Sequence, residues 1–169
     1  MTTAISDMHD GHTLRGQYDT QPTVGLASGE RIVRGPQAWR QVADLAVARA
    51  GERPVILVDA YPGVDVPELT AQVRAALPDW RIVDVETAAR PVDEVERLIA
   101  SNLTDDRVFG VMSHFVLTDF YEPQRLAELA TTLEGPAVVI GWGAALLRPL
   151  LGTASTTVLV DMARWEIQL

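Results

Sequence analysis

The chain lacks cysteine and lysine entirely, and these two absences exclude several kinds of chemistry. Without cysteine it can form no disulfide, no thiolate nucleophile and no cysteine-ligated zinc site. Without lysine it has no amine for Schiff-base chemistry. It also cannot supply the lysine with which a phosphate-binding P-loop reaches the β- and γ-phosphates of a nucleotide. All 14 positively charged side chains are arginine.

The chain also lacks an excess of positive charge and any long apolar run. Its formal net charge of −9 argues against a general nucleic-acid-binding protein, which usually presents a basic face. No apolar run approaches the roughly 18 residues that span a membrane. Residues 1–10 lack the basic region and apolar segment of a signal peptide. We therefore expect a cytoplasmic protein with neither a membrane nor a nucleic acid as partner.

The composition that is present predicts one globular domain preceded by a tail. Hydrophobic residues make up 47% of the 169-residue chain, which is enough for a proper core. Residues 1–22 are polar without periodicity, and we interpret them as a flexible N-terminal tail. Residues 23–169 are expected to form a single α/β domain. Because residues 161–169 read as a strand end entering a further element, we expect a fragment or short relative of a longer protein.

Apolar segments typical of buried strands alternate with amphipathic segments typical of helices. The expected strands cover residues 55–59, 81–85, 108–112, 137–141 and 157–161, with a further strand or hairpin within 24–34. The expected helices begin at Pro36 and cover residues 67–77, 91–100, 123–133 and 144–151. This alternation predicts a three-layer α/β fold with a mostly parallel sheet flanked by helices. Ligands of such sheets bind beyond the carboxyl ends of the strands.

The loop at residues 59–65 follows the first buried strand and precedes a helix, which is the position of a P-loop in a nucleotide kinase. In the pattern G-x-x-x-x-G-K-[ST], the glycine positions are Ala60 and Asp65 here, and the lysine and hydroxyl positions are Val66 and Pro67. A carboxylate about 4 Å from a phosphate opposes it by about 1 kcal/mol in water. We therefore expect a tight turn that caps the helix, or a remodelled site for a less anionic ligand.

Three segments, at residues 55–65, 103–112 and 158–169, carry a family resemblance, and the block Asp-Met-Ala-Arg-Trp-Glu-Ile-Gln at 161–168 is its most specific part. The chain resembles the N-terminal, uridine-kinase-like domain found ahead of the isomerase domain in bacterial class I mannose-6-phosphate isomerase-related proteins. The resemblance implies a P-loop-kinase-like fold with a degenerate phosphate loop. It also implies a place in carbohydrate metabolism beside a zinc-dependent isomerase domain, but it does not imply isomerase activity for this chain.

The candidate ligand-binding residues share a position at an expected strand end or in a polar loop near one. They are Asp59, Tyr61, Gly63, Asp106, Arg107, His114, Asp161 and Arg164. Arg107 or Arg164 would contact an anion, because a guanidinium group binds phosphate or carboxylate with two parallel hydrogen bonds. Each candidate also has a structural interpretation, such as a capped turn, a local ion pair or a packed histidine. No catalytic residue and no metal ligand is assigned.

Three functions remain open at this point. The leading expectation is a non-catalytic, kinase-like accessory or ligand-binding domain of a mannose-6-phosphate isomerase-type protein. It would bind a small sugar phosphate or nucleoside, or pack against an isomerase domain, and would need no cofactor. The alternative is a nucleoside or sugar kinase-like phosphotransferase with an atypical P-loop, which would require Mg-ATP. The third is a pure interaction domain, which predicts an exposed apolar patch near Trp165 and no polar cleft.

Overall fold

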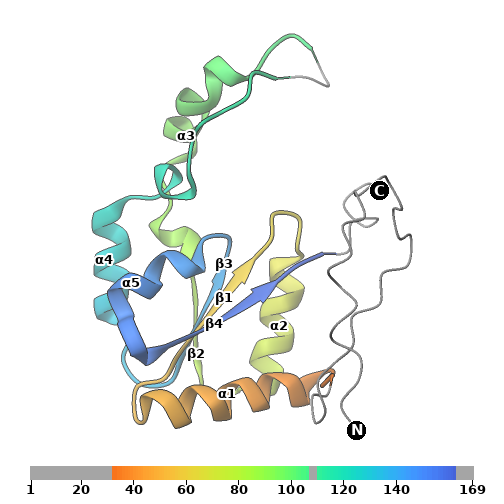
Figure 1. The fold of residues 1–169 in the computed structure, drawn as a ribbon, viewed down its shortest axis with the longest axis vertical. Helices are drawn as coiled ribbons and strands as arrows, with labels where there is room; N and C mark the ends of the chain where they lie inside the picture. The colour runs from red at the N-terminus through yellow and green to blue at the C-terminus, as the bar shows by residue number, and fades with distance from the viewer. Residues whose placement is uncertain (1–31, 107–109, 163–169) are drawn as a thin grey trace, which may run out of the picture. The chain divides into compact units, whose positions relative to one another are not determined.

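A computed structural model describes residues 32–106 and 110–162, and a parallel sheet of four strands forms its centre (Figure 1). The strands are β1 (Val55–Ala60), β2 (Arg81–Asp84), β3 (Ala137–Gly141) and β4 (Ser155–Val160). Their order across the sheet is β2-β3-β1-β4, so β1 and β3 are the central strands. Both central strands are continuous apolar runs, as expected of strands that are buried on both faces.

Helices cover both faces of this sheet. The helices that the structure describes are α1 (Pro36–Ala50), α2 (Val66–Ala76), α3 (Val92–Ile99), α4 (Pro123–Thr132) and α5 (Arg148–Leu151), with short 3-10 turns that include η1 (Val85–Ala88) and η4 (Ala144–Leu147). Side chains of α1 and α2 form a core with one face, and those of α4 and η4 form a core with the other. The prediction of an α/β fold with a parallel sheet flanked by helices is confirmed.

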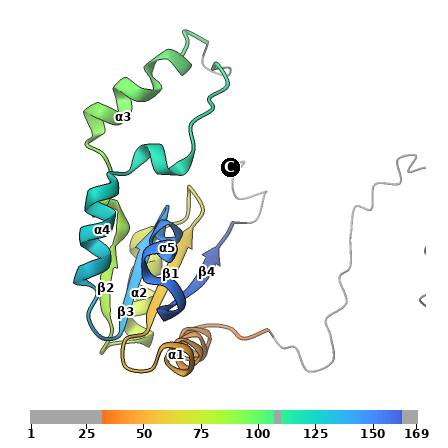
Figure 2. The same ribbon diagram turned by 60° about the vertical axis from the view of Figure 1, so that its left-hand side comes forward.

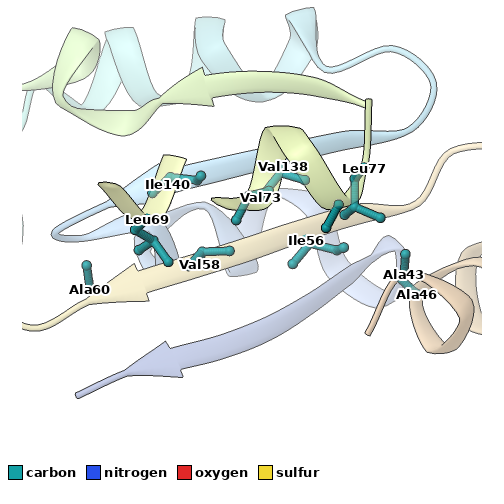
Figure 3. Packing of buried hydrophobic residues seen from close by; sticks show 11 residues of the cluster. Ala43, Ala46, Ile56, Val58, Ala60, Leu69, Val73, Leu77, Val138 and Ile140 are labelled. Atoms are coloured by element: carbon teal, nitrogen blue, oxygen red, sulfur yellow. The ribbon is translucent and has the colours of Figure 1, made fainter. Parts of the chain in front are cut away.

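The two-residue period of a strand divides the side chains of β1 between the two cores. Ile56, Val58 and Ala60 point toward α1 and α2, where Figure 3 shows them beside Leu69 and Val73 of α2. Val55 and Leu57 belong to the opposite core. The same alternation places Asp59 on the face of Val55 and Leu57, at the end of the strand.

Some expected elements differ from the structure. Residues 110–112 form no strand, and 107–109, the rest of that expected segment and its boundary, lie outside the described residues. Met112 is 84% exposed, so this apolar run lies away from the sheet, and hydrophobicity alone did not determine a strand there. The expected helix at 144–151 is divided into η4 and α5. The expected tail at 1–22 and residues 24–31 of the expected strand or hairpin within 24–34 lie outside the described residues.

The segment between Ala89 and Tyr121, which we call the arm, extends away from the sheet (Figures 1 and 2). An antiparallel bridge between Ala89 and Tyr121 closes its base. The arm carries α3, which contains no buried residue although its sequence is strongly amphipathic. Several large apolar side chains in the described part of the arm are exposed, and outside α3 they include Leu103, Val111, Met112 and Val116. No described helix is long and apolar enough to cross a membrane.

We predict that Ile56→Ala lowers the free energy of unfolding by about 2–5 kcal/mol, because it leaves a cavity in the core between β1 and α2. Ile56 is 0% exposed. Leu159→Ala is the matched control, since Leu159 is 70% exposed and its loss should change stability by less than about 0.5 kcal/mol. Equilibrium urea unfolding measures both variants. Equal losses for the two would contradict the assigned core.

Candidate functional site

The carboxyl ends of β1 and β3 mark the point where a ligand is expected in a sheet of this type. The connection after β1 runs through α2 on one face and leads to β2. The connection after β3 runs through η4 on the other face and leads to β4. Two adjacent strands whose connections leave on opposite faces open a crevice between their ends, which is the usual binding position of open α/β folds.

In this protein the carboxylate of Asp59 lies at these strand ends and accepts hydrogen bonds from two backbone N–H groups. Its Oδ1 accepts a hydrogen bond of 3.0 Å from the backbone N–H of Gly143 and one of 3.2 Å from that of Ala145. Asp59 reaches them because it lies on the η4 face of β1, in register with Gly141 of β3. Backbone N–H groups at the start of a helical turn are common anion donors. Here an internal anion already uses them.

The loop after β1 is a tight turn followed by a capped helix, as predicted. The N–H of Val64 donates to the carbonyl oxygen of Tyr61 over 3.1 Å, and Gly63 has a φ of 106°, which glycine adopts readily at the third position of a turn. The carboxylate of Asp65 accepts from the N–H of Glu68 at 2.9 Å and so caps α2. A second internal carboxylate thus bonds a donor at the start of α2.

Tyr121 supports the turn between β3 and η4 from the side. Its side chain is 1% exposed, its hydroxyl donates to the carbonyl oxygen of Trp142, and its ring packs against that of Trp142. A Cβ at Gly143 would lie only 2.9 Å from the Tyr121 ring, and Gly143 has a φ of 89°. Glycine is therefore required at position 143 on both steric and conformational grounds.

The electrostatic environment of the strand ends is negative. Burial, and after it the negative charges of Glu86, Asp84 and Asp59, together raise the pKa of Tyr121 from 10.0 to about 12. Asp65 and Asp161 are two more carboxylates that follow strands β1 and β4, and no arginine or histidine occurs in residues 59–65, 84–88, 141–143 or 161–162. These segments at the strand ends therefore provide no positively charged side chain that could pair with a polyphosphate.

The structure brings four of the eight candidate residues to one end of the sheet. Asp59, Tyr61, Gly63 and Asp161 belong to or follow the adjacent strands β1 and β4, whose residues Ala60 and Val160 pair in register. Tyr61 is 44% exposed there. The carboxylate of Asp161 accepts from the N–H of Met162, whose sulfur lies beside Gly63.

The other four candidates are separated from that group or lie outside the described residues. Asp106 and His114 belong to the arm, which Figure 1 shows extending from the sheet. Arg107 and Arg164, the two expected anion contacts, lie outside the described residues, as does Trp165. No group of three or more histidine, aspartate or glutamate side chains in the described ranges is placed to hold a metal ion.

A polar groove lies between α2 and the end of β2, and it was not predicted from the sequence. Two adjoining cavities share the side chains of Val66, Thr70, Arg74 and Asp84, and have volumes of about 170 Å³ and about 480 Å³. Glu86 lines the outer cavity. Asp84 and Glu86 lie at the carboxyl end of a predicted strand, and that position was the available signal. Nothing in the sequence indicated that Arg74 would face them.

Comparison with known families gives one match. The profile of a family described as a domain of unknown function, DUF8485, matches residues 38–169, which is most of the chain. The chain belongs to the DUF8485 family. No curated protein and no solved structure gives a significant match. The match covers all four strands of the sheet and the arm, so the DUF8485 domain includes both the strand ends and the groove.

We predict that Asp59→Ala lowers the free energy of unfolding of this DUF8485 domain by about 1–3 kcal/mol, because it leaves part-buried N–H groups of Gly143 and Ala145 without their acceptor. Asp59→Asn keeps an acceptor oxygen at the same position, so its free energy of unfolding should fall by less. Urea unfolding of both variants provides the measurement. Wild-type stability in Asp59→Ala would show that the two hydrogen bonds contribute nothing.

A second prediction concerns the stability of the domain at alkaline pH. Because the pKa of Tyr121 is about 12 in the folded chain and 10.0 is its ordinary value, folding favours the neutral phenol. This contribution is complete below pH 10 and is lost as the pH rises toward about 12. The free energy of unfolding should therefore fall more steeply over this range in the wild type than in Tyr121→Phe. If the free energy of unfolding falls equally with pH in the two proteins, the prediction is wrong.

Proposed function

We propose that this DUF8485 domain is a non-catalytic, kinase-like accessory domain that binds a small ligand and packs against another domain. The parent protein would be a sugar-phosphate protein of the mannose-6-phosphate isomerase type, as the resemblance at 55–65, 103–112 and 158–169 implies. The kinase-like part of the proposal is supported by a central strand, β1, that is followed by a turn and then a helix, which is the arrangement around a P-loop.

The observation that carries the non-catalytic part is the pair of hydrogen bonds from Gly143 and Ala145 to Asp59. Phosphoryl transfer depends on positioning phosphates with backbone N–H groups, a lysine and a metal ion. At this sheet edge internal carboxylates bond such N–H groups, and the chain has no lysine. Displacing Asp59 would leave its carboxylate without these donors and beside an incoming phosphate.

The arm supports the packing part of the proposal. An amphipathic helix normally buries its apolar side, yet α3 buries none of its residues within the described chain. Exposed apolar side chains continue along the arm through Leu103, Val111 and Met112. Contiguous exposed apolar surface is typical of a protein interface. The occupant that fits the proposed parent protein is its isomerase domain. The third reading, a pure interaction domain, is less well supported because a polar groove is present.

The rival function, a phosphotransferase that uses arginine in place of lysine, makes a direct prediction. A nucleotide present at 100 times its Kd would stabilise the fold by about 2.7 kcal/mol. We expect no rise in melting temperature with millimolar ATP and Mg²⁺, measured by differential scanning fluorimetry on the full chain. A saturable rise with ATP would overturn the non-catalytic proposal.

A gain-of-function variant extends this test. Asp65→Gly combined with Val66→Lys removes the capping carboxylate and supplies the missing P-loop amine. If the scaffold derives from a P-loop, the pair should gain measurable affinity for inorganic phosphate. The matched control is Asp161→Gly, which removes one carboxylate from the same edge without adding an amine. Equal responses from the two variants would show that the added amine makes no specific contact with phosphate.

A further inference from the structure

We infer that the groove between α2 and β2 binds a small zwitterion of the amino-acid type, with its carboxylate on Arg74 and its ammonium group on Asp84 and Glu86. This inference rests on the proposed ligand-binding role and specifies its site and ligand class. The site lies on the α2 face of the sheet, whereas Asp59 and Tyr121 lie toward the opposite face.

The groove has the dimensions and walls of a small-molecule site. Its outer cavity of about 480 Å³ falls in the range of about 300–1,000 Å³ that is common for ligand pockets. Its inner cavity of about 170 Å³ is more enclosed, and Ile82, Val83 and Ile140 form part of its lining. Both cavities combine charged side chains with apolar ones, which suits a molecule with charged groups and an apolar side chain.

Arg74 is available to a ligand because its own helix provides no acidic partner. Positions three and four residues away on either side, where helical ion pairs form, hold Thr70, Ala71, Leu77 and Pro78. In contrast, Arg97 of α3 pairs with Asp93 over 3.0 Å, four residues earlier. Within the described residues Arg74 makes no hydrogen bond or ion pair, although it lines both cavities with Asp84.

The carboxylates on the other side of the groove also retain free acceptors. Asp84 uses Oδ1 to accept from the N–H of Glu86 over 2.8 Å, which leaves its Oδ2. The side chain of Glu86 has no hydrogen-bond or ion-pair partner among the described residues. Two carboxylates opposite one guanidinium group therefore present separate sites for an ammonium group and a carboxylate.

The charge balance of the groove favours a zwitterion over a sugar phosphate or a nucleoside. One arginine and two carboxylates leave an excess of negative charge in a chain whose net charge is −9. A sugar phosphate would place its anionic group beside Arg74 but also close to both carboxylates, which would repel it. A nucleoside carries no acid for Arg74. A molecule with one carboxylate and one ammonium group satisfies all three side chains without adding net charge.

The test is isothermal titration calorimetry of the full chain with each of the common L-amino acids. We expect at least one to bind with one-to-one stoichiometry, and its methyl ester and its N-acetyl derivative to bind at least tenfold more weakly. Arg74→Met and Glu86→Gln should each weaken binding at least tenfold. The matched controls are Arg40→Met and Glu96→Gln, which change exposed side chains of α1 and α3 outside the groove and should leave affinity unchanged.

Three outcomes would overturn the inference: no amino acid binds at millimolar concentration, Arg74→Met binds as tightly as the wild type, or glucose 6-phosphate displaces the bound amino acid. Circular dichroism confirms that each variant is folded before titration. The proposed function fails separately. Stabilisation by Mg-ATP would reject the non-catalytic role whatever the groove binds, whereas an inert nucleotide together with no amino-acid binding would reject the groove inference alone.

Discussion

The arrangement of the central strand ends depends on the hydrogen bonds that the carboxylate of Asp59 accepts. The two central strands end side by side, and the chain turns sharply after β3 at Gly143. That turn leaves N–H groups of Gly143 and Ala145 pointing back toward β1, where Asp59 accepts both. An internal carboxylate thereby uses the N–H groups at the carboxyl ends of the two central strands. An anionic ligand there would have to displace a carboxylate that the fold itself supplies.

The two faces of the sheet differ at the strand ends: the η4 face is filled by side chains, whereas the α2 face has an open groove. On the η4 face, Asp59, Tyr121 and Trp142 fill the space with hydrogen bonds and packed rings. On the α2 face, the end of β2 and the side of α2 from Val66 to Arg74 leave a groove whose charged side chains form no ion pair with one another in the described chain. The same strand ends therefore have one side filled by internal hydrogen bonds and packed rings, and another side with an open groove lined by charged side chains.

In the arm, the local sequence predicted a helix correctly but did not predict which residues pair or pack with one another. The helical pattern at 91–100 predicted α3, because apolar spacing and a leading proline act within one helix. The apolar run at 110–112 resembled a strand, yet a strand requires a neighbour, and these residues have none in the described sheet. Their exposure reflects tertiary arrangement rather than composition.

The sequence by itself determined the elements and turns whose causes are local. The alternation of apolar runs and helices, the Pro62–Gly63 turn and the Asp65 cap all depend on residues within a few positions of one another, and all were predictable. Only the tertiary structure decided what Asp59 and Arg74 do. Asp59 accepts a hydrogen bond from an N–H 84 residues away, and Arg74 lines a groove together with Asp84 of β2 and Glu86 of η1. Such contacts arise when the sheet assembles, so no local pattern encodes them.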